Sequence, residues 1–340
     1  MSKRGWCVVV VLGVALALTV SASAQEPFYK GKTIRVIVGL SPGGGYDTYS
    51  RLIARHMGKH IPGNPTIIVE NMTGAASRIS ANHIYRVAKP DGLTIGHFLG
   101  TLFTQQLMEK PGIEFDARKF EYLGVPAQDN YVISVSKATG ITSAEQWIAA
   151  KTRVKLGGVG VGSPTDDVPK ILAATIGLPV QMVAGYKGTA DIRLAFQSGE
   201  VQGVCNAWES LKATWRKELD AGEFTMLLQA TAKAHPELPN IPLAISFAKT
   251  DEARKLIEGT VHTIPPTARP YVLPPGTPKE RVQLLRKAFM DTFKDPEFLG
   301  EAQKAKLDVN PADGAELERN VREIFNLEPA LVARLKEILK

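Results

Sequence analysis

Three consecutive glycines near the start of the chain join an apolar strand pattern to an amphipathic helix pattern, and few folds accommodate that junction. Residues 34–55 read IRVIVGLSPGGGYDTYSRLIAR, with apolar residues first almost uninterrupted and then at helical spacing. Gly43, Gly44 and Gly45 permit positive φ and let backbone N–H groups approach a ligand closely. The first amides of the helix lack partners within it, and the helix dipole is positive there. The stretch therefore predicts an α/β unit with an anion-binding site at the helix start.

Residues 1–24 have the pattern of a secretory signal peptide. Lys3 and Arg4 precede an apolar run over residues 6–20, and three small residues follow before Gln25. The run is shorter than the about 20 residues that span a bilayer, so an uncleaved membrane anchor is the less favoured alternative. We expect export to the periplasm and a mature protein that begins near Gln25.

Composition narrows the class of protein. A chain of 340 residues with 44% hydrophobic and 22% charged residues can bury the cores of two α/β lobes. The formal net charge of +7 includes Lys3 and Arg4, and the remaining excess is spread along the chain. Without a basic cluster interleaved with aromatic residues, a nucleic-acid partner is not expected. Cys7 lies in the expected signal peptide, so cleavage would leave Cys205 as the one cysteine of the mature protein. The mature fold is therefore expected to be stabilised by its hydrophobic core rather than by an intramolecular disulfide.

Strand and helix patterns alternate along the rest of the chain, as in βαβ units. Strands are expected at residues 33–38, 66–69, 93–98, 131–135, 154–161, 180–183, 201–204 and 226–229. The chain is expected to cross between two sheets near residue 130 and again near residue 228. We therefore predict an α/β, bilobed solute-binding fold of type II, with two open sheets flanked by helices and a ligand cleft between them. The expected division is a signal peptide at 1–24, a first lobe at 25–129, a second lobe at 130–227, and a return to the first lobe with C-terminal helices at 228–340.

The strongest enzymatic hint lies in the same first loop. Residues 39–43 match the nucleophile-elbow pattern G-x-S-x-G between a strand and a helix, which makes a serine hydrolase using Ser41 the alternative function. The residue after such a serine must donate its backbone N–H to the oxyanion hole, and Pro42 has none. We therefore predict a protein that is not an enzyme.

Cofactor and metal motifs are incomplete. Residues 158–163 resemble a dinucleotide fingerprint without its last small residue, and neither glycine loop carries the Gly-Lys-Ser/Thr of a P-loop. His56 and His60 are four apart without an HExxH motif, so they are interpreted as partners of a helix C-terminus rather than as metal ligands. No cofactor and no metal are expected.

Charged and polar residues near the predicted helix starts are candidates for ligand contact. Asp47 suits the helix dipole, and it could also accept from a ligand or a water molecule. Arg78 opposes the dipole of its helix, which favours an anionic partner, although a solvated arginine is equally consistent. Tyr186 and Lys187 beside Gly188 are polar tips that suit either a cleft or an ordinary loop.

Six short segments, in this order, resemble the periplasmic receptors of the tripartite tricarboxylate transporter family, also called Bug receptors. The segments are Ser41-Pro-Gly-Gly-Gly-Tyr-Asp47, Val69-Glu-Asn-Met-Thr-Gly-Ala75, Pro90-Asp-Gly-Leu-Thr94, Gly160-Val-Gly-Ser-Pro164, Tyr186-Lys-Gly188 with Gly199-Glu-Val201, and Pro274-Pro-Gly-Thr-Pro278. The resemblance implies a monomeric periplasmic protein that binds a small organic carboxylate, a di- or tricarboxylate or an aromatic acid, and delivers it to membrane permease subunits.

The resemblance also implies which residues contact the ligand. They are Ser41, Gly43, Gly44, Gly45, Tyr46, Asp47, Gly74, Ala75, Ala76, Ser77, Arg78, Asn130, Ser163, Thr165, Asp166, Tyr186, Lys187, Gly188 and Asn206. The chain departs from the family pattern at Tyr46, where a small hydroxyl residue is usual, and at Asn206, where an aspartate is common. Arg78 suggests a second anionic group on the ligand.

Overall fold

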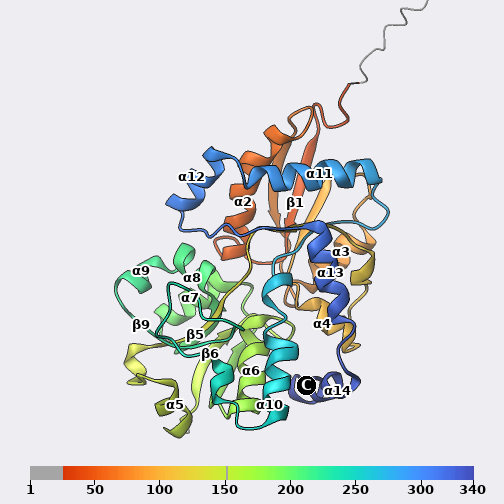
Figure 1. Ribbon diagram of the computed structural model, residues 1–340. Coiled ribbons are helices and arrows are strands. Elements are labelled where there is room, and N and C mark those ends of the chain that lie inside the picture. The colour runs from red at the N-terminus through yellow and green to blue at the C-terminus, as the bar shows by residue number, and fades with distance from the viewer. Residues whose placement is uncertain (1–25, 151) are drawn as a thin grey trace, which may run out of the picture.

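The computed structural model describes residues 26–150 and 152–340, and it has two α/β lobes, one above the other in Figure 1. Each lobe is a mixed sheet flanked by helices, which confirms the predicted bilobed fold. The expected signal peptide, residues 1–24, lies outside the described residues. A membrane-spanning helix is not found among the described residues.

The strands form two sheets of different size. The six-stranded sheet of the first lobe has the order β11-β4-β10-β3-β1-β2, and the five-stranded sheet of the second lobe has the order β7-β6-β8-β5-β9. The strands of the first sheet are β1 (Thr33–Val38), β2 (Thr66–Asn71), β3 (Thr94–His97), β4 (Glu121–Val125), β10 (Tyr271–Leu273) and β11 (Ala312–Asp313). Those of the second are β5 (Tyr131–Ser136), β6 (Val154–Gly158), β7 (Val180–Ala184), β8 (Gly203–Ala207) and β9 (Phe224–Gln229).

Helices cover both sheets and connect their strands. They are α2 (Gly45–Met57), α3 (Arg78–Arg86), α4 (Leu102–Leu107), α5 (Ala144–Ala150), α6 (Pro164–Ile176), α7 (Thr189–Gln197), α8 (Trp208–Thr214), α9 (Arg216–Asp220), α10 (Asp251–Leu256), α11 (Lys279–Thr292), α12 (Pro296–Lys304), α13 (Gly314–Ile324) and α14 (Pro329–Ile338). Each sheet contains two parallel pairs, namely β1 with β2 and with β3 in the first sheet, and β6 with β7 and with β8 in the second. The crossover segments β10 and β5 run antiparallel to their neighbours.

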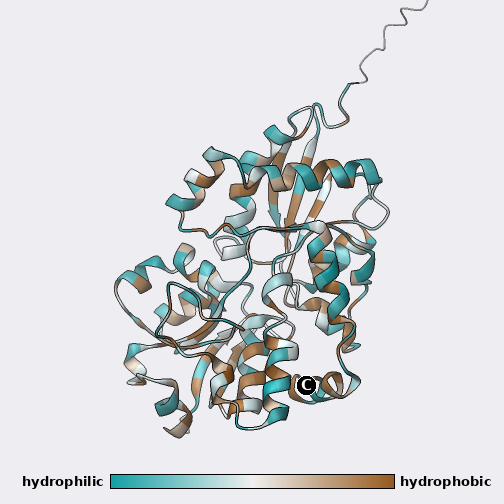
Figure 2. Cartoon of the chain, viewed as in Figure 1, coloured by the Kyte–Doolittle hydropathy of each residue, from teal (hydrophilic) through white to brown (hydrophobic). Residues whose placement is uncertain are grey.

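The core of each lobe lies between its sheet and the helices. Figure 2 shows brown, hydrophobic residues on the strands and on the sheet-facing sides of helices, with teal residues facing outward. Ile34 and Val38 of β1 are fully buried, as expected for a strand covered on both faces. Cys205 in β8 is also buried, which agrees with its interpretation as a small core residue.

The chain returns to the first sheet later than expected. The predicted boundary at residue 228 falls inside β9, which pairs with β5 of the second lobe. Residues 244–267 then pack on the second lobe, since Ile257 and Ile264 belong to its core, and the return crossing lies at 268–270. The C-terminal helix α14 also packs against α6 through its apolar face, so it covers the second lobe rather than the first (Figure 1).

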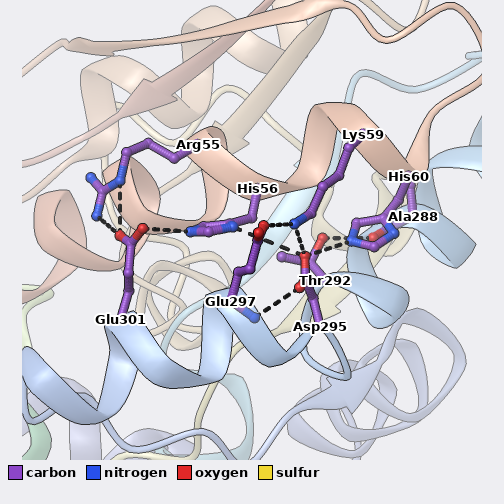
Figure 3. Close-up of polar contacts among 9 residues, drawn as sticks. All are labelled: Arg55, His56, Lys59, His60, Ala288, Thr292, Asp295, Glu297 and Glu301. Carbon is purple, nitrogen blue, oxygen red and sulfur yellow. Dashed lines mark hydrogen bonds and ion pairs between the residues drawn. The ribbon is translucent and has the colours of Figure 1, made fainter.

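An ion-pair network joins the carboxyl end of α2 to the start of α12 (Figure 3). Arg55 pairs with Glu301 at 2.7 Å, and Lys59 pairs with Asp295 and with Glu297. His60 Nε2 lies 3.3 Å from Asp295 Oδ2. Arg55 and Lys59 face both the negative end of α2 and carboxylates at the start of α12, so the network fixes α12 against α2.

The same group has ligand atoms close enough for a metal. Atoms of His56, Asp295 and Glu297 lie within 4.8 Å of one another. The Lys59 ammonium contacts both carboxylates, so the group already contains the positive charge that balances them. We interpret it as an ion-pair network in which the histidines lie at the helix C-terminus, as the sequence indicated.

Substituting Asp295 by alanine should lower the free energy of unfolding by about 1–2 kcal/mol. Asp295 Oδ1 accepts from the Glu297 N–H at 3.0 Å and caps α12, while Lys59 holds the pKa of Asp295 at about 2. Urea denaturation measures the loss, and Asp295→Asn, which keeps the capping oxygen, should lose less. Because the native pKa is depressed, the gap between wild type and Asp295→Asn should shrink as the pH falls from about 4 toward 2. Equal losses in both variants would contradict the capping role.

Candidate ligand-binding site

The loops at the carboxyl ends of the strands in the two lobes face and touch each other. The Ser41 N–H, after β1, donates to the Lys187 carbonyl, after β7, at 3.0 Å. The Thr101 hydroxyl, after β3, donates to the Gly162 carbonyl, after β6, at 2.6 Å. The two lobes are therefore in contact across the cleft that a bilobed fold places at this position.

A small cavity of about 30 Å³ lies between the lobes at this contact. It is lined by Leu40, Tyr46, Leu99, Asp129, Tyr131, Val159, Ser163, Pro164, Thr165, Thr189, Asn206, Ala207, Ser210 and Arg269. The first three belong to the first lobe, Asp129 and Arg269 to the two crossings, and the others to the second lobe. Its walls are mainly aliphatic and aromatic, with a few polar groups, which is the usual character of a small-molecule pocket.

Arg269 and Asp129 form a buried ion pair in the wall of this cavity. Their side chains are 0% and 1% exposed, and Arg269 Nε donates to Asp129 Oδ1. Asp129 Oδ2 also accepts from the Tyr131 hydroxyl at 2.8 Å. Burial alone would lower the pKa of Arg269, but the Asp129 charge raises it, so the guanidinium keeps its proton. The pair ties the first crossing to the return crossing.

Aromatic rings hold the Arg269 side chain in place. The guanidinium carbon lies 4.6 Å from the ring centre of Tyr46 and 4.9 Å from that of Tyr49. Tyr46 is itself fixed, because its hydroxyl donates to the Ala268 carbonyl at 2.6 Å and its ring stacks on His97. Burial lowers the pKa of His97 to about 3, so this imidazole is neutral at physiological pH.

Two buried N–H donors that line the cavity have no hydrogen-bond partner among the described residues. They are Arg269 Nη1 and Asn206 Nδ2. The orientation of the Asn206 amide is determined by its neighbour, because Asn206 Oδ1 accepts from the Ala207 N–H at 2.9 Å. Buried donors are rarely left unsatisfied, so both groups are available to an acceptor in the cavity.

Several glycine-loop amides are already paired with carboxylates of the chain itself. Gly43 N–H donates to Asp47 Oδ2 at 2.9 Å, Gly160 N–H to Asp166 Oδ2 at 2.8 Å, and Gly162 N–H to Asp167 Oδ1 at 3.1 Å. These carboxylates lie in the first turns of α2 and α6, where the helix dipole favours them. The three amides therefore have partners without a ligand.

Comparison with known proteins identifies the family. The family model described as the tripartite tricarboxylate transporter family receptor matches residues 50–336. The chain belongs to this receptor family. The receptor is 25% identical over 322 residues to the UPF0065 protein in the gbd 5′ region of Cupriavidus necator, covering 92% of this chain and 90% of that protein. It is also 25% identical over 287 residues to a UPF0065 protein of Bordetella pertussis, covering 83% of each.

Solved structures share the fold of this receptor. The periplasmic binding protein BugD superposes with a TM-score of 0.73 at 20% identity, covering 91% of this chain and 98% of BugD. MatC from Rhodopseudomonas palustris with bound malate gives a TM-score of 0.70 at 18% identity, covering 91% and 99%. Rpa4515 of R. palustris with adipate gives 0.69 at 21% identity, covering 90% and 96%. The receptor thus has the fold of solute-binding proteins rather than of an enzyme.

The structure brings part of the expected site to the cavity. Of the expected contact residues, the cavity is lined by Tyr46, Ser163, Thr165 and Asn206. The sequence interpretation missed Leu40, Leu99, Asp129, Tyr131, Val159, Pro164, Thr189, Ala207, Ser210 and Arg269. Gly44 and Gly188 lie at the contact between the lobes, close to Thr189 and to Ser41 respectively.

The second expected loop, residues 74–78, is not among the residues that line the cavity. Ala75, Ala76 and Ser77 have φ of 47°, 51° and 65°, a left-handed turn that costs about 1–2 kcal/mol per non-glycine residue. The turn places the Ser77 hydroxyl so that it accepts from the Leu99 N–H at 2.9 Å. Gly74 precedes this turn with a φ of 130°. These residues support the loop that carries Leu99 rather than contacting the cavity themselves.

Three other expected contacts have partners elsewhere. Arg78 donates to the Pro111 carbonyl at 2.8 Å and does not line the cavity. With Ala75 and Ala76 it lines a neighbouring hollow, which shares Val159 with the cavity. The Tyr186 hydroxyl donates to Glu200 at 2.7 Å. Asn130 Nδ2 donates to Glu209 at 2.7 Å and so fixes the first crossing to α8.

Ser41 does not have the surroundings of a nucleophile. Its hydroxyl donates to Asp191 Oδ2 at 2.7 Å across the contact between the lobes. A serine hydrolase requires a base that accepts the serine proton and a third group that orients the base, whereas the partner of Ser41 is a carboxylate. This hydrogen bond places Ser41 at the contact between the lobes.

Stability should depend on pH through Asp167, which connects the lobes. Asp167 Oδ2 accepts from Gln105 Nε2 of α4 at 3.1 Å, and burial raises the pKa of Asp167 to about 7. Since the native pKa lies above the ordinary value of about 3.9, the stabilising contribution is complete below that value and is lost as the pH rises through about 7. Urea denaturation between about pH 4 and pH 8 should show wild type losing at least about 1 kcal/mol relative to Asp167→Asn, and parallel curves would contradict this.

Proposed function

We propose that this receptor binds a small organic carboxylate in the cavity between its lobes. The observation that carries the proposal is the pair of unpartnered buried donors, Arg269 Nη1 and Asn206 Nδ2, in an otherwise mainly apolar cavity. A carboxylate supplies two acceptor oxygens and forms charge-assisted hydrogen bonds with such donors. The family supports this choice, because MatC has bound malate and Rpa4515 adipate.

The start of α2 is proposed to add to the attraction for a negative charge. Gly45 and Tyr46 begin this 13-residue helix, and Tyr46 lines the cavity. The positive end of the helix dipole favours an anion within its first turn. Ser163, Thr165 and Asn206 are proposed to contact the ligand from the second lobe.

Ligand binding is proposed to stabilise the closed arrangement of the lobes. The crossings at residues 126–130 and 268–270 would act as hinges, and Ser41, Lys187 and Gly188 would form the contact that closes the cleft. A ligand shifts the equilibrium toward the closed state only by its differential affinity for that state. An acid that contacts both lobes meets this requirement.

The biological setting follows from the family. We propose that the chain is exported to the periplasm by a cleaved signal peptide over residues 1–24, acts there as a monomer, and delivers its ligand to membrane permease subunits of a tripartite transporter. The proposal includes no cofactor and no catalytic step.

A thermal-shift screen with mono-, di-, tri- and aromatic carboxylic acids tests the proposal. At a concentration of about 100 times its Kd, an acid should stabilise the receptor by about 2.7 kcal/mol, which is visible as a rise in Tm. The primary amides of the same acids serve as matched controls and should produce no shift. A purified, folded receptor that responds to none of the acids would overturn the proposed function.

A further inference from the structure

The Arg269 guanidinium is held in place by the protein, and one of its nitrogens, Nη1, is unpaired among the described residues. Its Nε donates to Asp129 and its Nη2 donates to the Ser210 hydroxyl at 2.7 Å, whereas Nη1 has no partner among the described residues. The whole side chain is 0% exposed and lines the cavity, so an acceptor for Nη1 has to come from the interior of the protein or from the cavity. Leaving a buried charged donor unpaired is costly, so a bound molecule that supplies an acceptor to Nη1 would be stabilised.

The unpaired nitrogen, Nη1, lies close to the first turn of α2. A Cβ at Gly45 would lie 3.4 Å from Arg269 Nη1 and 2.0 Å from the Ser210 hydroxyl, so the missing side chain makes room for both. A cation beside the positive end of a helix is unfavourable unless an anion joins them. Asp129 bonds Nε of the guanidinium and leaves Nη1 without a carboxylate partner among the described residues.

Asn206 supplies a second donor of fixed direction from the opposite lobe. Its Oδ1 is held by the Ala207 N–H, so Nδ2 is the atom left free. Both unpartnered groups are donors, and the hydroxyls of Tyr46 and Tyr131 are already donating to other acceptors. The cavity therefore selects an acceptor group rather than an ammonium or another donor.

The rest of the cavity offers little to a second charge. Among the described residues that line it, Arg269 is the one cationic side chain. The amides of Gly160 and Gly162 in the facing loop are taken by Asp166 and Asp167. Leu40, Leu99 and Val159 are among the residues that form its walls. A second carboxylate would be buried there without a second cation to balance its charge, at a large cost.

We infer that Arg269 is the carboxylate anchor, assisted by Asn206, and that the ligand is an acid with a single carboxylate and a small apolar body. This inference rests on the proposed function and narrows it to monocarboxylates. Recognition joins the return crossing, which carries Arg269, to the second lobe, which carries Asn206. One carboxylate bound by both Arg269 and Asn206 would connect the return crossing, which is the proposed hinge, to the second lobe.

Isothermal titration calorimetry with the full mature receptor tests both parts of the inference. The probes are the monocarboxylates butyrate, isovalerate and benzoate, and the polycarboxylates succinate, malate, adipate and citrate. The best monocarboxylate should bind at least about tenfold more tightly than any polycarboxylate. Arg269→Gln and Asn206→Leu should each weaken its binding by roughly 10- to 100-fold, because each removes a hydrogen bond to a charged oxygen.

Control variants separate recognition from folding. Arg286→Gln removes an arginine that donates to the Tyr122 carbonyl at 2.6 Å outside the cavity, and it should keep the wild-type Kd within about twofold. Because Arg269→Gln leaves Asp129 buried without its partner, the double variant Asp129→Asn/Arg269→Gln and the charge-conserving Arg269→Lys are measured beside it. Circular dichroism establishes that each variant is folded. The three variants with a substitution at Arg269 should all bind the acid more weakly than the wild type.

The outcomes distinguish this inference from the proposed function. A wild-type receptor that binds no acid would overturn both. A wild-type receptor that binds an acid, while folded Arg269 variants and Asn206→Leu keep its Kd within about twofold, would overturn the anchor and leave the proposed function intact. A polycarboxylate that binds more tightly than every monocarboxylate would overturn the single-charge ligand.

Discussion

The variant Asp129→Ala should lose about 3–5 kcal/mol of unfolding free energy, because it leaves the Arg269 guanidinium buried without its counter-ion. Asp129 also accepts from the Tyr131 hydroxyl at 2.8 Å, so the same change leaves a second donor unpaired. The pair joins the two crossings, and its loss acts on both lobes at once. Equilibrium urea denaturation, followed by the fluorescence of the buried residues Trp147 and Trp215, measures the effect.

Asp129→Asn is the matched variant for this prediction. The amide keeps an oxygen that can accept from Arg269, so most of the loss in Asp129→Asn should come from the missing charge alone. We expect Asp129→Asn to be intermediate between the wild type and Asp129→Ala. A loss below about 1 kcal/mol in Asp129→Ala would contradict the account, since it would mean that Arg269 is not buried without a partner.

Replacing Gly45 by alanine should weaken binding of the best acid by about tenfold or more. The new Cβ would lie 2.0 Å from Ser210 Oγ and 2.8 Å from Ser210 Cβ, so α2 and α8 could no longer approach as closely as they do. Overpacking of this kind costs about 1–3 kcal/mol, and the cost falls on the closed arrangement of the lobes. Alanine favours a helix over glycine by about 1 kcal/mol, so helix propensity acts in the opposite direction.

Two measurements test the Gly45 variant together. Calorimetry gives the Kd, and small-angle scattering gives the radius of gyration with and without the acid. Gly300→Ala in α12 is the matched control, because a Cβ there would meet nothing within 4 Å. An unchanged Kd together with a normal decrease in radius on binding would show that the contact between Gly45 and Ser210 does not limit closure.

Local patterns in the sequence were sufficient to predict most of the strands. Residues 33–38 form β1 as expected, and the apolar run at 131–135 is β5 with one residue more. The start of α5 is fixed by a reciprocal cap, because the Ser143 hydroxyl accepts from the Gln146 N–H at 3.2 Å and the Gln146 side chain accepts from the Thr142 N–H. Hydrophobic periodicity determines where elements form, whereas cap geometry determines their exact ends.

The assignment of segments to lobes required tertiary contacts. The sequence interpretation placed the return to the first lobe near residue 228, but apolar residues at 244–267 pack in the core of the second lobe. Helix α14 is amphipathic like α13, and nothing in its own pattern specifies which lobe it covers. Packing against α6 determines this.

The sequence predicted the cavity-lining residues that lie at the starts of helices, but it did not predict those that lie on the crossings between the lobes. Tyr46, Ser163 and Thr165 follow strands and open helices, so the rule for ligands of open sheets predicts them. Arg269 lies on the return crossing, which the sequence interpretation placed about 40 residues too early. The available signal was an arginine followed by Pro270 immediately before the buried strand β10, where a charge needs a partner.

The most direct test of an interlobe carboxylate site is the crystal structure of the receptor with its tightest-binding acid. The account predicts closed lobes and the acid in the cavity, with carboxylate oxygens about 2.7–3.0 Å from Arg269 Nη1 and Asn206 Nδ2. An acid bound outside the cavity, or a cavity without the acid in crystals of a complex that forms in solution, would contradict it.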